Sequence, residues 1–268
     1  MTRRRLDQEL VRRGLAASRT EAQALIESGS VLVGGTIAAK AARQTDASES
    51  LVVTERPRFV GRGGSKLEAA LDGFGLDPSG LRALDAGSST GGFTDCLLQR
   101  GAASVIAVDV GTHQLHERLR ADPRVDVRER TDIRSVRTEH TDGPLDVVVA
   151  DLSFISVRSV AAELLALTSP SGWLVILVKP QFEAGRPEVS RGRGVISDPE
   201  IWRRCLTEAI AALIDVGASI MGAMVSPLRG ADGNVEFLVH ARHAGAADAI
   251  GADEVDATID AVVAEVVR

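Results

Sequence analysis

The sequence predicts that four charged residues lie together at one end of a sheet, where a bound molecule could react. They are Lys66, Asp151, Lys179 and Glu236. Asp151 and Lys179 each follow an aliphatic run that is typical of a buried strand. Ligands in open α/β sheets bind beyond the carboxyl ends of the strands, so both side chains should face a bound molecule. A lysine that leaves such a run is partly desolvated, which favours its neutral form. An acidic residue in an apolar strand, as Glu236 is predicted to be, needs a cationic partner.

Each of these residues also has a simpler interpretation when it is taken alone. Lys179 is compatible with a lysine that extends into solvent along its aliphatic stem, although Pro180 stiffens the exit from the strand. Lys66 alone would be a surface lysine, and Glu236 alone would be a solvent-facing position on an alternating strand. Only together do the two cations and two anions favour a site.

The segment from Leu84 to Thr94 predicts a cofactor site. A short apolar run ends at Asp85, a glycine-rich turn follows, and a helix is expected over residues 94–100. Such a turn lets the backbone approach a nucleotide-like cofactor closely. The spacing is not G-x-G-x-x-G, so a dinucleotide is not the first choice. A carboxylate beside the turn suits the cationic centres of S-adenosylmethionine, and the predicted contacts are Asp85, Gly87, Ser88, Ser89, Thr90, Gly91, Gly92 and Phe93.

Three more acidic residues at predicted strand ends extend this site. Asp109, with Val110 after it, ends the second strand and lies 22 positions after Gly87, which favours hydrogen bonds to a ribose diol over an ordinary turn aspartate. Asp132 follows the third strand, where it could accept from an adenine amino group or cap a helix, and both readings remain open. Asp151, at the end of the fourth strand, would also contact the cofactor.

The elements that must position these residues alternate strand and helix, which predicts a parallel sheet with helices on both faces. Between residues 226 and 234 there is no room for a crossover helix, so the last two strands should form an antiparallel hairpin. This is the α/β architecture of class I methyltransferases. The expected strands are residues 81–85, 104–109, 125–128, 145–150, 172–178, 219–226 and 234–242, with a long helix at 199–216 and an acidic amphipathic helix at 246–268.

The N-terminal part has a different composition. Residues 1–66 contain 12 Lys and Arg and 7 Asp and Glu, a net charge of +5, whereas the remainder carries −11. A polyanion would therefore meet this part first. Two helices, the second opened by a capping box at Ser18 and Glu21, and short strands at 31–33 and 51–53 predict a small unit. We expect a small basic domain at 1–55, although such a charge cluster is more often a solvated face, then a linker at 56–64, a helix capped by Ser65, and a second domain with the methyltransferase architecture at 65–268; the resemblance described below implies that the first domain binds RNA.

Composition limits the alternatives. The chain has 268 residues, 44% of them hydrophobic, but only 3% aromatic, so its core should be aliphatic. Two cysteines make neither a disulfide framework nor a metal cluster, and the N-terminus lacks the apolar region of a signal peptide, so we expect a cytoplasmic protein without a metal. The longest weakly charged stretch, 209–225, is shorter than a membrane helix needs.

Several motifs resemble the TlyA (hemolysin A) family along nearly the whole chain. The four charged residues match, in order and context, the Lys-Asp-Lys-Glu tetrad of metal-independent ribose 2'-O-methyltransferases of the RrmJ/FtsJ type. The segment from Leu15 to Val31 is similar to the S-four RNA-binding module. The remaining matches are Arg62-Gly63-Gly64-Ser65-Lys66-Leu67, Asp85-Ala86-Gly87-x-Ser89-Thr90-Gly91-Gly92-Phe93-Thr94, Asp151-Leu152-Ser153-Phe154-Ile155-Ser156 and Val178-Lys179-Pro180-Gln181-Phe182-Glu183.

The resemblance implies S-adenosylmethionine-dependent methylation of cytidine ribose 2'-hydroxyls in ribosomal RNA, at the subunit interface, and with it susceptibility to capreomycin-type antibiotics. It implies that Lys179 is the base or polarises the hydroxyl, with the other three tetrad residues in support. Partners would be ribosomal subunits, bound by a monomer that does not associate with membranes. The residues expected on RNA are Arg3, Arg4, Arg5, Arg12, Arg13, Arg19 and Arg62, with Phe154 either stacked on a flipped-out base or packed in the core.

The sequence departs from the family pattern at three places: Arg58-Phe59-Val60, Asp132 and Thr112-His113. The N-terminal arginines and the terminal helix favour the longer subtype of the family, which acts on both subunits.

Competing hypotheses are a non-catalytic RNA-binding assembly factor, a membrane-active hemolysin and a methyltransferase for a small metabolite. The intact glycine-rich turn and tetrad argue against the first, and the basic N-terminal part argues against the last.

Overall fold

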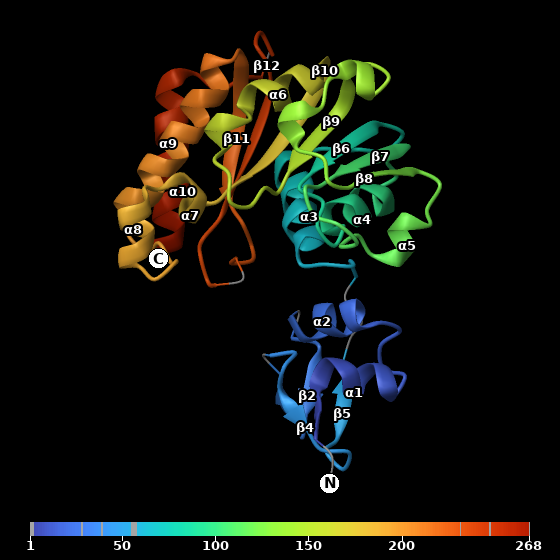
Figure 1. The fold of residues 1–268 in the computed structure, drawn as a ribbon. Helices are drawn as coiled ribbons and strands as arrows, with labels where there is room; N and C mark the ends of the chain where they lie inside the picture. The colour runs from blue at the N-terminus through green and yellow to red at the C-terminus, as the bar shows by residue number, and fades with distance from the viewer. Residues whose placement is uncertain are drawn as a thin grey trace.

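The computed structural model describes residues 3–27, 29–38, 40–54, 58–230, 232–246 and 248–267. Figure 1 shows a small N-terminal unit and a larger unit built on one sheet. Of the predicted linker, residues 56 and 57 lie outside the described residues, as does the last residue of the predicted terminal helix.

The small unit has its own aliphatic core between two helices and short strands. Leu6 and Leu10 of the first helix and Leu25 and Ile26 of the second are buried against Val31. Ser18 accepts a hydrogen bond from the Glu21 N–H at 3.1 Å, which confirms the predicted helix cap, and the Glu21 carboxylate accepts from the N–H of Ala17. The elements are β1 (Arg4–Arg5), α1 (Leu6–Arg12), α2 (Arg19–Glu27), β2 (Val31–Val33), β3 (Thr36–Ile37), β4 (Gln44–Thr45) and β5 (Leu51–Val53).

The large unit contains a seven-stranded sheet in the order β11-β12-β10-β9-β6-β7-β8. The five strands from β10 to β8 are parallel, and β12 is antiparallel to both of its neighbours. This confirms the predicted α/β fold with a parallel sheet and a terminal hairpin. The strands are β6 (Arg82–Ala86), β7 (Ser104–Val108), β8 (Val125–Arg128), β9 (Leu145–Ala150), β10 (Thr168–Val178), β11 (Ala218–Val225) and β12 (Phe237–His243).

Helices cover both faces because alternate residues of each central strand point to opposite sides. In β9, Val147 and Val149 pack with the layer that includes α3 and α4, while Val148 and Ala150 pack with the layer of α6, α9 and α10. Figure 1 shows these two layers on either side of the sheet. The helices are α3 (Gly63–Phe74), α4 (Gly92–Gln99), α5 (Glu117–Arg120), η1 (Ile133–Ser135), η2 (Thr138–His140), η3 (Val157–Ser159), α6 (Ala161–Leu167), α7 (Pro180–Glu183), α8 (Arg186–Arg191), α9 (Pro199–Asp215) and α10 (Ala252–Val267).

The terminal helix α10 is shorter than predicted, and its apolar side, including Val255 and Ile259, is buried in the core layer with α9. Among the described residues, no helix has both the length and the apolar character that crossing a membrane requires.

Two of the predicted element boundaries were wrong near the site. Helix α3 begins at Gly63 with Arg62 as its N-cap, so Ser65 lies within the first turn and is not the cap. Strand β12 begins at Phe237, so Glu236 lies in the loop just before it and not inside the strand. The N–H of Ser226 donates to the carbonyl of Glu236 at 2.9 Å, which closes the hairpin loop at this position.

Glycines let the start of α3 press directly against the start of α4. A Cβ on Gly92 would lie 2.8 Å from the backbone nitrogen of Gly64 and 3.1 Å from the Cα of Gly63. Real Cβ atoms essentially never approach backbone atoms this closely, so no larger residue fits without moving α3. This contact sets where α3, and with it Lys66, stands above the sheet.

We expect Gly92→Ala to destabilise the protein by about 1–3 kcal/mol, because the added methyl group meets backbone atoms that cannot rotate away. Gly185→Ala is the matched control, since its Cβ would meet nothing closer than 3.6 Å. Thermal unfolding of both variants checks this. Equal midpoints for the two variants would contradict the close contact between α3 and α4.

Candidate functional site

Two connected hollows lie at the carboxyl edge of the parallel strands. The tetrad hollow, of about 370 Å³, is lined by Lys66, Asp151, Lys179 and Glu236 among others. The turn hollow, of about 600 Å³, is lined by the ends of β7 and β9 and the segment around Asp132. The two hollows form one continuous groove because they share wall residues. The shared residues are Gly87, Ser89, Asp151, Ser153 and Phe154.

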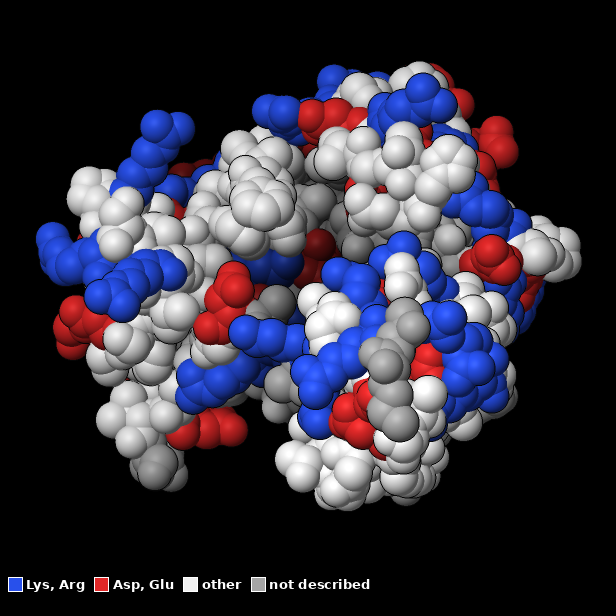
Figure 2. Space-filling view, turned by 60° about the horizontal axis from the view of Figure 1, so that its bottom comes forward, with Lys and Arg blue, Asp and Glu red and all other residues white. Residues whose placement is uncertain are grey.

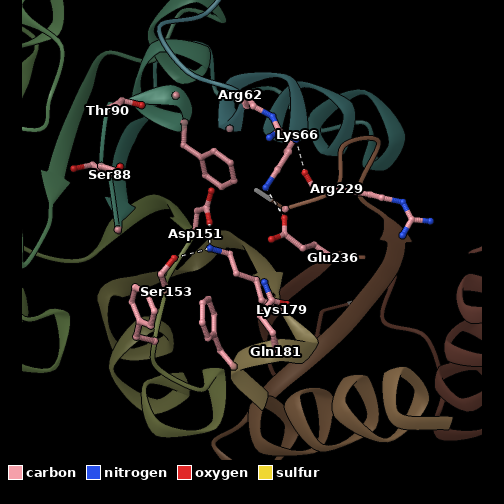
Figure 3. Close-up of a pocket in the computed structure, with 18 of the residues that line it drawn as sticks. Arg62, Lys66, Ser88, Thr90, Asp151, Ser153, Lys179, Gln181, Arg229 and Glu236 are labelled. Carbon is pink, nitrogen blue, oxygen red and sulfur yellow. Dashed lines mark hydrogen bonds and ion pairs between the residues drawn. The ribbon is translucent and has the colours of Figure 1, made fainter. Parts of the chain in front are cut away.

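The four predicted tetrad residues come together as two ion pairs. Lys179 Nζ lies 2.6 Å from Asp151 Oδ1 and donates to Ser153 Oγ at 3.0 Å. Lys66 Nζ donates to Glu236 Oε2. Figure 3 shows the two pairs facing each other across the hollow. The structure therefore brings together four residues that are as much as 170 positions apart in the sequence.

The elements explain why these side chains meet. Strands β9 and β10 are parallel neighbours, with Ala150 paired to Ile176, so the residues just beyond them leave the sheet at the same edge. Asp151 is held there by its N–H, which donates to the carbonyl of Ala86 at 2.9 Å. Pro180 opens α7 directly after Lys179 and turns the chain away. Lys66 reaches the edge from α3 and Glu236 from the loop before β12.

Burial makes the pairing obligatory. Lys66 and Lys179 are only 7% and 8% exposed, and Glu236 only 3%. A buried charge whose partner is removed loses both its hydration and its ion pair, which typically costs about 3–5 kcal/mol. The pairs thus fix the Nζ atoms of Lys66 and Lys179 at the wall of the tetrad hollow.

Asp109 presents a carboxylate to the turn hollow from a rigid position. Its Oδ1 accepts from the N–H of Gly111 at 2.7 Å and its Oδ2 from the N–H of Ser89 at 2.8 Å. A carboxylate has about four acceptor sites, so two remain for hydroxyl groups. The neighbouring Val110 is 70% exposed and lines the same hollow. The arrangement suits a ribose diol.

Asp132 also lines the turn hollow, and it caps η1. Its Oδ1 accepts from the N–H of Arg134 at 2.9 Å, and its hydrogen bonds with the Arg134 side chain lower its pKa to about 2. The helix-cap interpretation is therefore confirmed. A contact with an adenine amino group stays a prediction, and the position of Asp132 in the wall of the hollow is compatible with it.

The glycine-rich turn lies between the two hollows. Gly87 has φ of 84°, and a Cβ there would lie 2.6 Å from the carbonyl oxygen of Asp151. Glycine at this position thus allows the turn to pack on the tetrad backbone. Residues from this turn that line one or both hollows are Gly87, Ser88, Ser89, Thr90, Gly92 and Phe93.

Gly91 has another role, because the space beside it is filled by protein. It has φ of 96°, and its Cβ would meet Leu119 at 2.2 Å. It belongs to neither hollow wall, so the predicted cofactor contact at Gly91 has no counterpart among the lining residues.

Asp85 is buried beneath the glycine-rich turn and does not line either hollow. Its side chain is 0% exposed and accepts from the N–H and the hydroxyl of Thr94 at 2.9 and 2.7 Å. Burial raises its pKa to about 7, against the lowering effect of the Thr94 hydrogen bonds. Asp85 Oδ2 therefore ties the end of β6 to α4 beneath the turn, while its Oδ1 has no hydrogen-bond partner in the described structure, and its contact with the cofactor stays a prediction.

Phe154 stands at the rim of the groove and not in the core. It is 91% exposed, has φ of 65°, and lines both hollows. Its ring lies 5.0 Å from that of Phe182, whose ring faces Lys179 Nζ at 5.7 Å. The core-packing reading was wrong, and the exposed ring is free to contact a ligand.

Sequence reasoning missed several residues of the tetrad hollow. Ser153, Gln181 and Phe182 lie within motifs that were recognised, yet only their charged neighbours had been singled out. The Gln181 side chain lines the hollow beside Lys179, and its Oε1 is buried without a hydrogen-bond partner in the described structure (Figure 3). Arg229 lies in a loop with no strand or helix pattern, and its carbonyl accepts from Arg62.

The N-terminal arginines surround two buried carboxylates. Arg5 and Arg19 pair with Asp7, while Arg4, Arg12 and Arg13 pair with Glu9. The hydrogen bonds from Arg12 and then Arg13 lower the pKa of Glu9 to about 2. Figure 2 shows Lys and Arg side chains gathered over the small unit. Arg3 is exposed at the start of the described chain. These ion pairs orient the arginines but leave most of them half exposed.

Comparison with known proteins adds two family matches. A model of the FtsJ-like methyltransferase matches residues 59–243, and a model of the S4 domain matches residues 4–49. The 16S/23S rRNA (cytidine-2'-O)-methyltransferase TlyA of Mycobacterium tuberculosis is 47% identical over 242 residues, 90% of each chain. The 23S rRNA (cytidine-2'-O)-methyltransferase TlyA of Campylobacter jejuni is 32% identical over 68% of this chain and 70% of the relative.

A solved structure shares the whole architecture. A protein of Streptococcus thermophilus, named as a hemolysin, superposes with a TM-score of 0.76 at 35% identity, covering 99% of this chain and 98% of that one.

We expect Asp85→Asn to change how stability depends on pH. Because the folded-state pKa of Asp85, about 7, is above its ordinary value of 3.8, folding favours the protonated carboxyl. That stabilisation is present below about pH 4 and is lost as pH rises through about 7. The difference in melting temperature, variant minus parent, should therefore increase from pH 5 to pH 8. Asp126→Asn, at an exposed carboxylate, serves as control, and parallel melting curves for Asp85→Asn and the parent would refute the assignment.

Proposed function

The chain belongs to the TlyA family of FtsJ-like methyltransferases with an N-terminal S4 domain, and from this premise we propose that it methylates the ribose 2'-hydroxyl of cytidines in ribosomal RNA. The methyl donor in this proposal is S-adenosylmethionine. The observation that carries the proposal is the pair of ion pairs in the tetrad hollow, which opens directly into the turn hollow. The names of the Mycobacterium tuberculosis and Campylobacter jejuni relatives support the substrate.

The turn hollow has the features that S-adenosylmethionine would need. Its volume of about 600 Å³ lies within the range typical of small-molecule sites. Asp109 would hold the ribose diol, Val110 and Ile133 would contact the adenine ring, and Asp132 would accept from the adenine amino group. When bound, S-adenosylmethionine supplies a methyl group already activated on a sulfonium.

The tetrad residues then have to orient a ribose hydroxyl and accept its proton. A ribose hydroxyl is a weak nucleophile, and a positioned base typically contributes about 10²–10⁴-fold to the rate. We assign this role to Lys179, whose Nζ is fixed by Asp151 and Ser153 at the junction of the two hollows. Lys179 Nζ would accept the hydroxyl proton while the bound donor supplies the methyl group.

The other three tetrad residues support this transfer. Asp151 holds the Lys179 amine in place and stabilises the ammonium group that forms. Lys66 lies across the hollow and completes the network, and Glu236 anchors it. Alignment of the reacting atoms can supply a further share of the barrier reduction, about 7–11 kcal/mol at best.

RNA binding is assigned to the small unit and to the rim of the groove. The half-exposed arginines Arg4, Arg12 and Arg19, with Arg3 and Arg5, would contact phosphates, and Arg62 would do so near the tetrad hollow. The exposed ring of Phe154 is suited to stack on a cytosine that has left its helix.

Both ribosomal subunits are proposed as substrates. The chain is more similar to the relative named for 16S and 23S rRNA than to the one named for 23S rRNA alone. We further propose that the protein works as a monomer in the cytoplasm, that the modified sites lie near the subunit interface, and that methylation confers susceptibility to capreomycin-type antibiotics.

The function is tested by incubating unmodified ribosomal subunits with labelled S-adenosylmethionine. We expect label in the RNA, retained as 2'-O-methylcytidine after digestion to nucleosides. No label, with subunits that the protein binds, would favour the non-catalytic assembly factor. Label in protein only would contradict RNA as the substrate.

We expect Lys179→Ala to abolish methyl transfer, because the hydroxyl loses its proton acceptor, while affinity for S-adenosylmethionine stays nearly unchanged. Single-turnover methylation and calorimetric titration of the cofactor measure the two effects separately. Arg124→Ala, which removes an exposed cation paired with Asp122, is the control and should methylate normally. Turnover by the Lys179 variant at the parent's rate would refute the assignment.

A further inference from the structure

Most arginines of the large unit are neutralised by a neighbouring carboxylate. This unit is acidic, since residues 67–268 carry a net charge of −11. Ion pairs within 4.0 Å hold Arg58, Arg100, Arg118, Arg120, Arg124, Arg128, Arg134, Arg158, Arg203 and Arg204. The other nine described arginines of this unit form no ion pair, so where they lie together decides whether they can act as a group.

Three unpaired arginines occur together at α8 and the loop after it. Arg186 and Arg191 are the first and last residues of α8, and Arg193 follows with φ of 52°. All three are exposed, and none forms an ion pair in the part of the chain that the structure describes. The one acidic residue of α8, Glu188, forms its ion pair with Arg204 of α9; Arg191 adds only a weaker charge interaction that also lowers the pKa of Glu188.

This group is joined to the mouth of the tetrad hollow. The side chain of Asn234, which is 1% exposed, donates to the carbonyl of Gly194 and accepts from the N–H of Ile196, both at 2.9 Å. The loop after α8 is thereby fixed to the loop that carries Arg229 and Glu236. Arg229 is exposed, and its carbonyl accepts from Arg62 at the start of α3. Neither Arg229 nor Arg62 has an ion pair within the described residues.

These five arginines form one basic strip, defined here as Arg62, Arg186, Arg191, Arg193 and Arg229. Figure 2 shows Lys and Arg side chains on the side of the large unit that holds α8 as well as over the small unit. Four other described arginines without an ion pair lie elsewhere. Arg82 and Arg137 donate to backbone carbonyls, as Arg62 and Arg229 do, but they do not line the tetrad hollow; Arg130 lies beyond β8 at the opposite edge of the sheet, and Arg242 lies in β12 with its Nε buried.

We propose that the basic strip is a second RNA-binding surface, which holds the phosphate backbone beside the target nucleotide while the small unit binds elsewhere on the same RNA. This inference rests on the proposed function and specifies how its substrate is held. The guanidinium groups of Arg186, Arg191 and Arg193 have no ion pair among the described residues and can make bidentate contacts with phosphate oxygens, while Arg62 and Arg229 each use one nitrogen for a backbone carbonyl. In the small unit, by contrast, Asp7 and Glu9 already occupy part of the guanidinium groups. The strip therefore contributes contacts that the N-terminal arginines do not replace.

The strip is tested with the full-length triple variant Arg186→Gln, Arg191→Gln and Arg193→Gln. Binding to unmodified ribosomal subunits is measured as a function of salt concentration. Each lost phosphate contact should reduce the slope of log K against log salt by about 1, so the triple variant should lose about 2–3 from the slope. Its affinity at low salt should fall at least tenfold. Cofactor affinity and melting temperature, measured on the same preparation, verify the fold.

The matched control is Arg120→Gln, Arg124→Gln and Arg128→Gln, which removes the same charge from arginines that are already paired. The control should keep the parent's slope. An α8 variant with the parent's slope, or a control with an equal loss, would overturn the proposal. Methylation by the parent protein is scored separately: if the parent binds subunits without methylating them, the proposed function fails while the strip is still tested.

Discussion

Two buried ion pairs are the interaction on which this site depends. Lys179 and Asp151 meet because β9 and β10 are adjacent and parallel and end at one edge, with 2.6 Å between Nζ and Oδ1. Lys66 and Glu236 arrive from a helix and a loop outside the parallel strands, so their contact has to be held by packing. Since neither pair tolerates the loss of one partner in a buried setting, the fold and the charge arrangement stabilise each other.

The packing that holds the second pair is a contact between backbones. Gly92 at the start of α4 lies so close to Gly63 and Gly64 that α3 has one position available to it. Asp85 fixes α4 to β6 from below through Thr94. A chain of rigid contacts therefore runs from the central strand to Lys66, and the glycine-rich turn that borders the turn hollow is part of it. Cofactor contact and tetrad geometry depend on the same few residues.

Sequence patterns predicted the parts of the site that follow from strand periodicity. Asp151, Lys179 and Asp109 were placed correctly at the sheet edge because each follows a run of aliphatic residues. Asp85 follows such a run too, yet it is buried, since the pattern marks where a strand ends and not which way the carboxylate points. Glu236 was placed inside a strand because Val235 and Phe237 continue the apolar pattern, although the loop closes only after it. Phe154 was ambiguous because a positive φ in a loop has no sequence signature outside glycine.

The distribution of ion pairs adds information that net charge conceals. The chain is acidic as a whole, and a count of charges would assign its RNA contacts to the N-terminal unit alone. Side-chain contacts show that the arginines there share two buried carboxylates, whereas those on α8 and at the rim of the tetrad hollow have no ion pair in the described structure. An arginine without a carboxylate partner gains more from a phosphate, because no existing ion pair is lost when the contact forms. The position of such residues beside the hollow follows from Asn234, which ties their loop to the one carrying Glu236. Substrate contact and tetrad geometry are thereby coupled through a single buried amide.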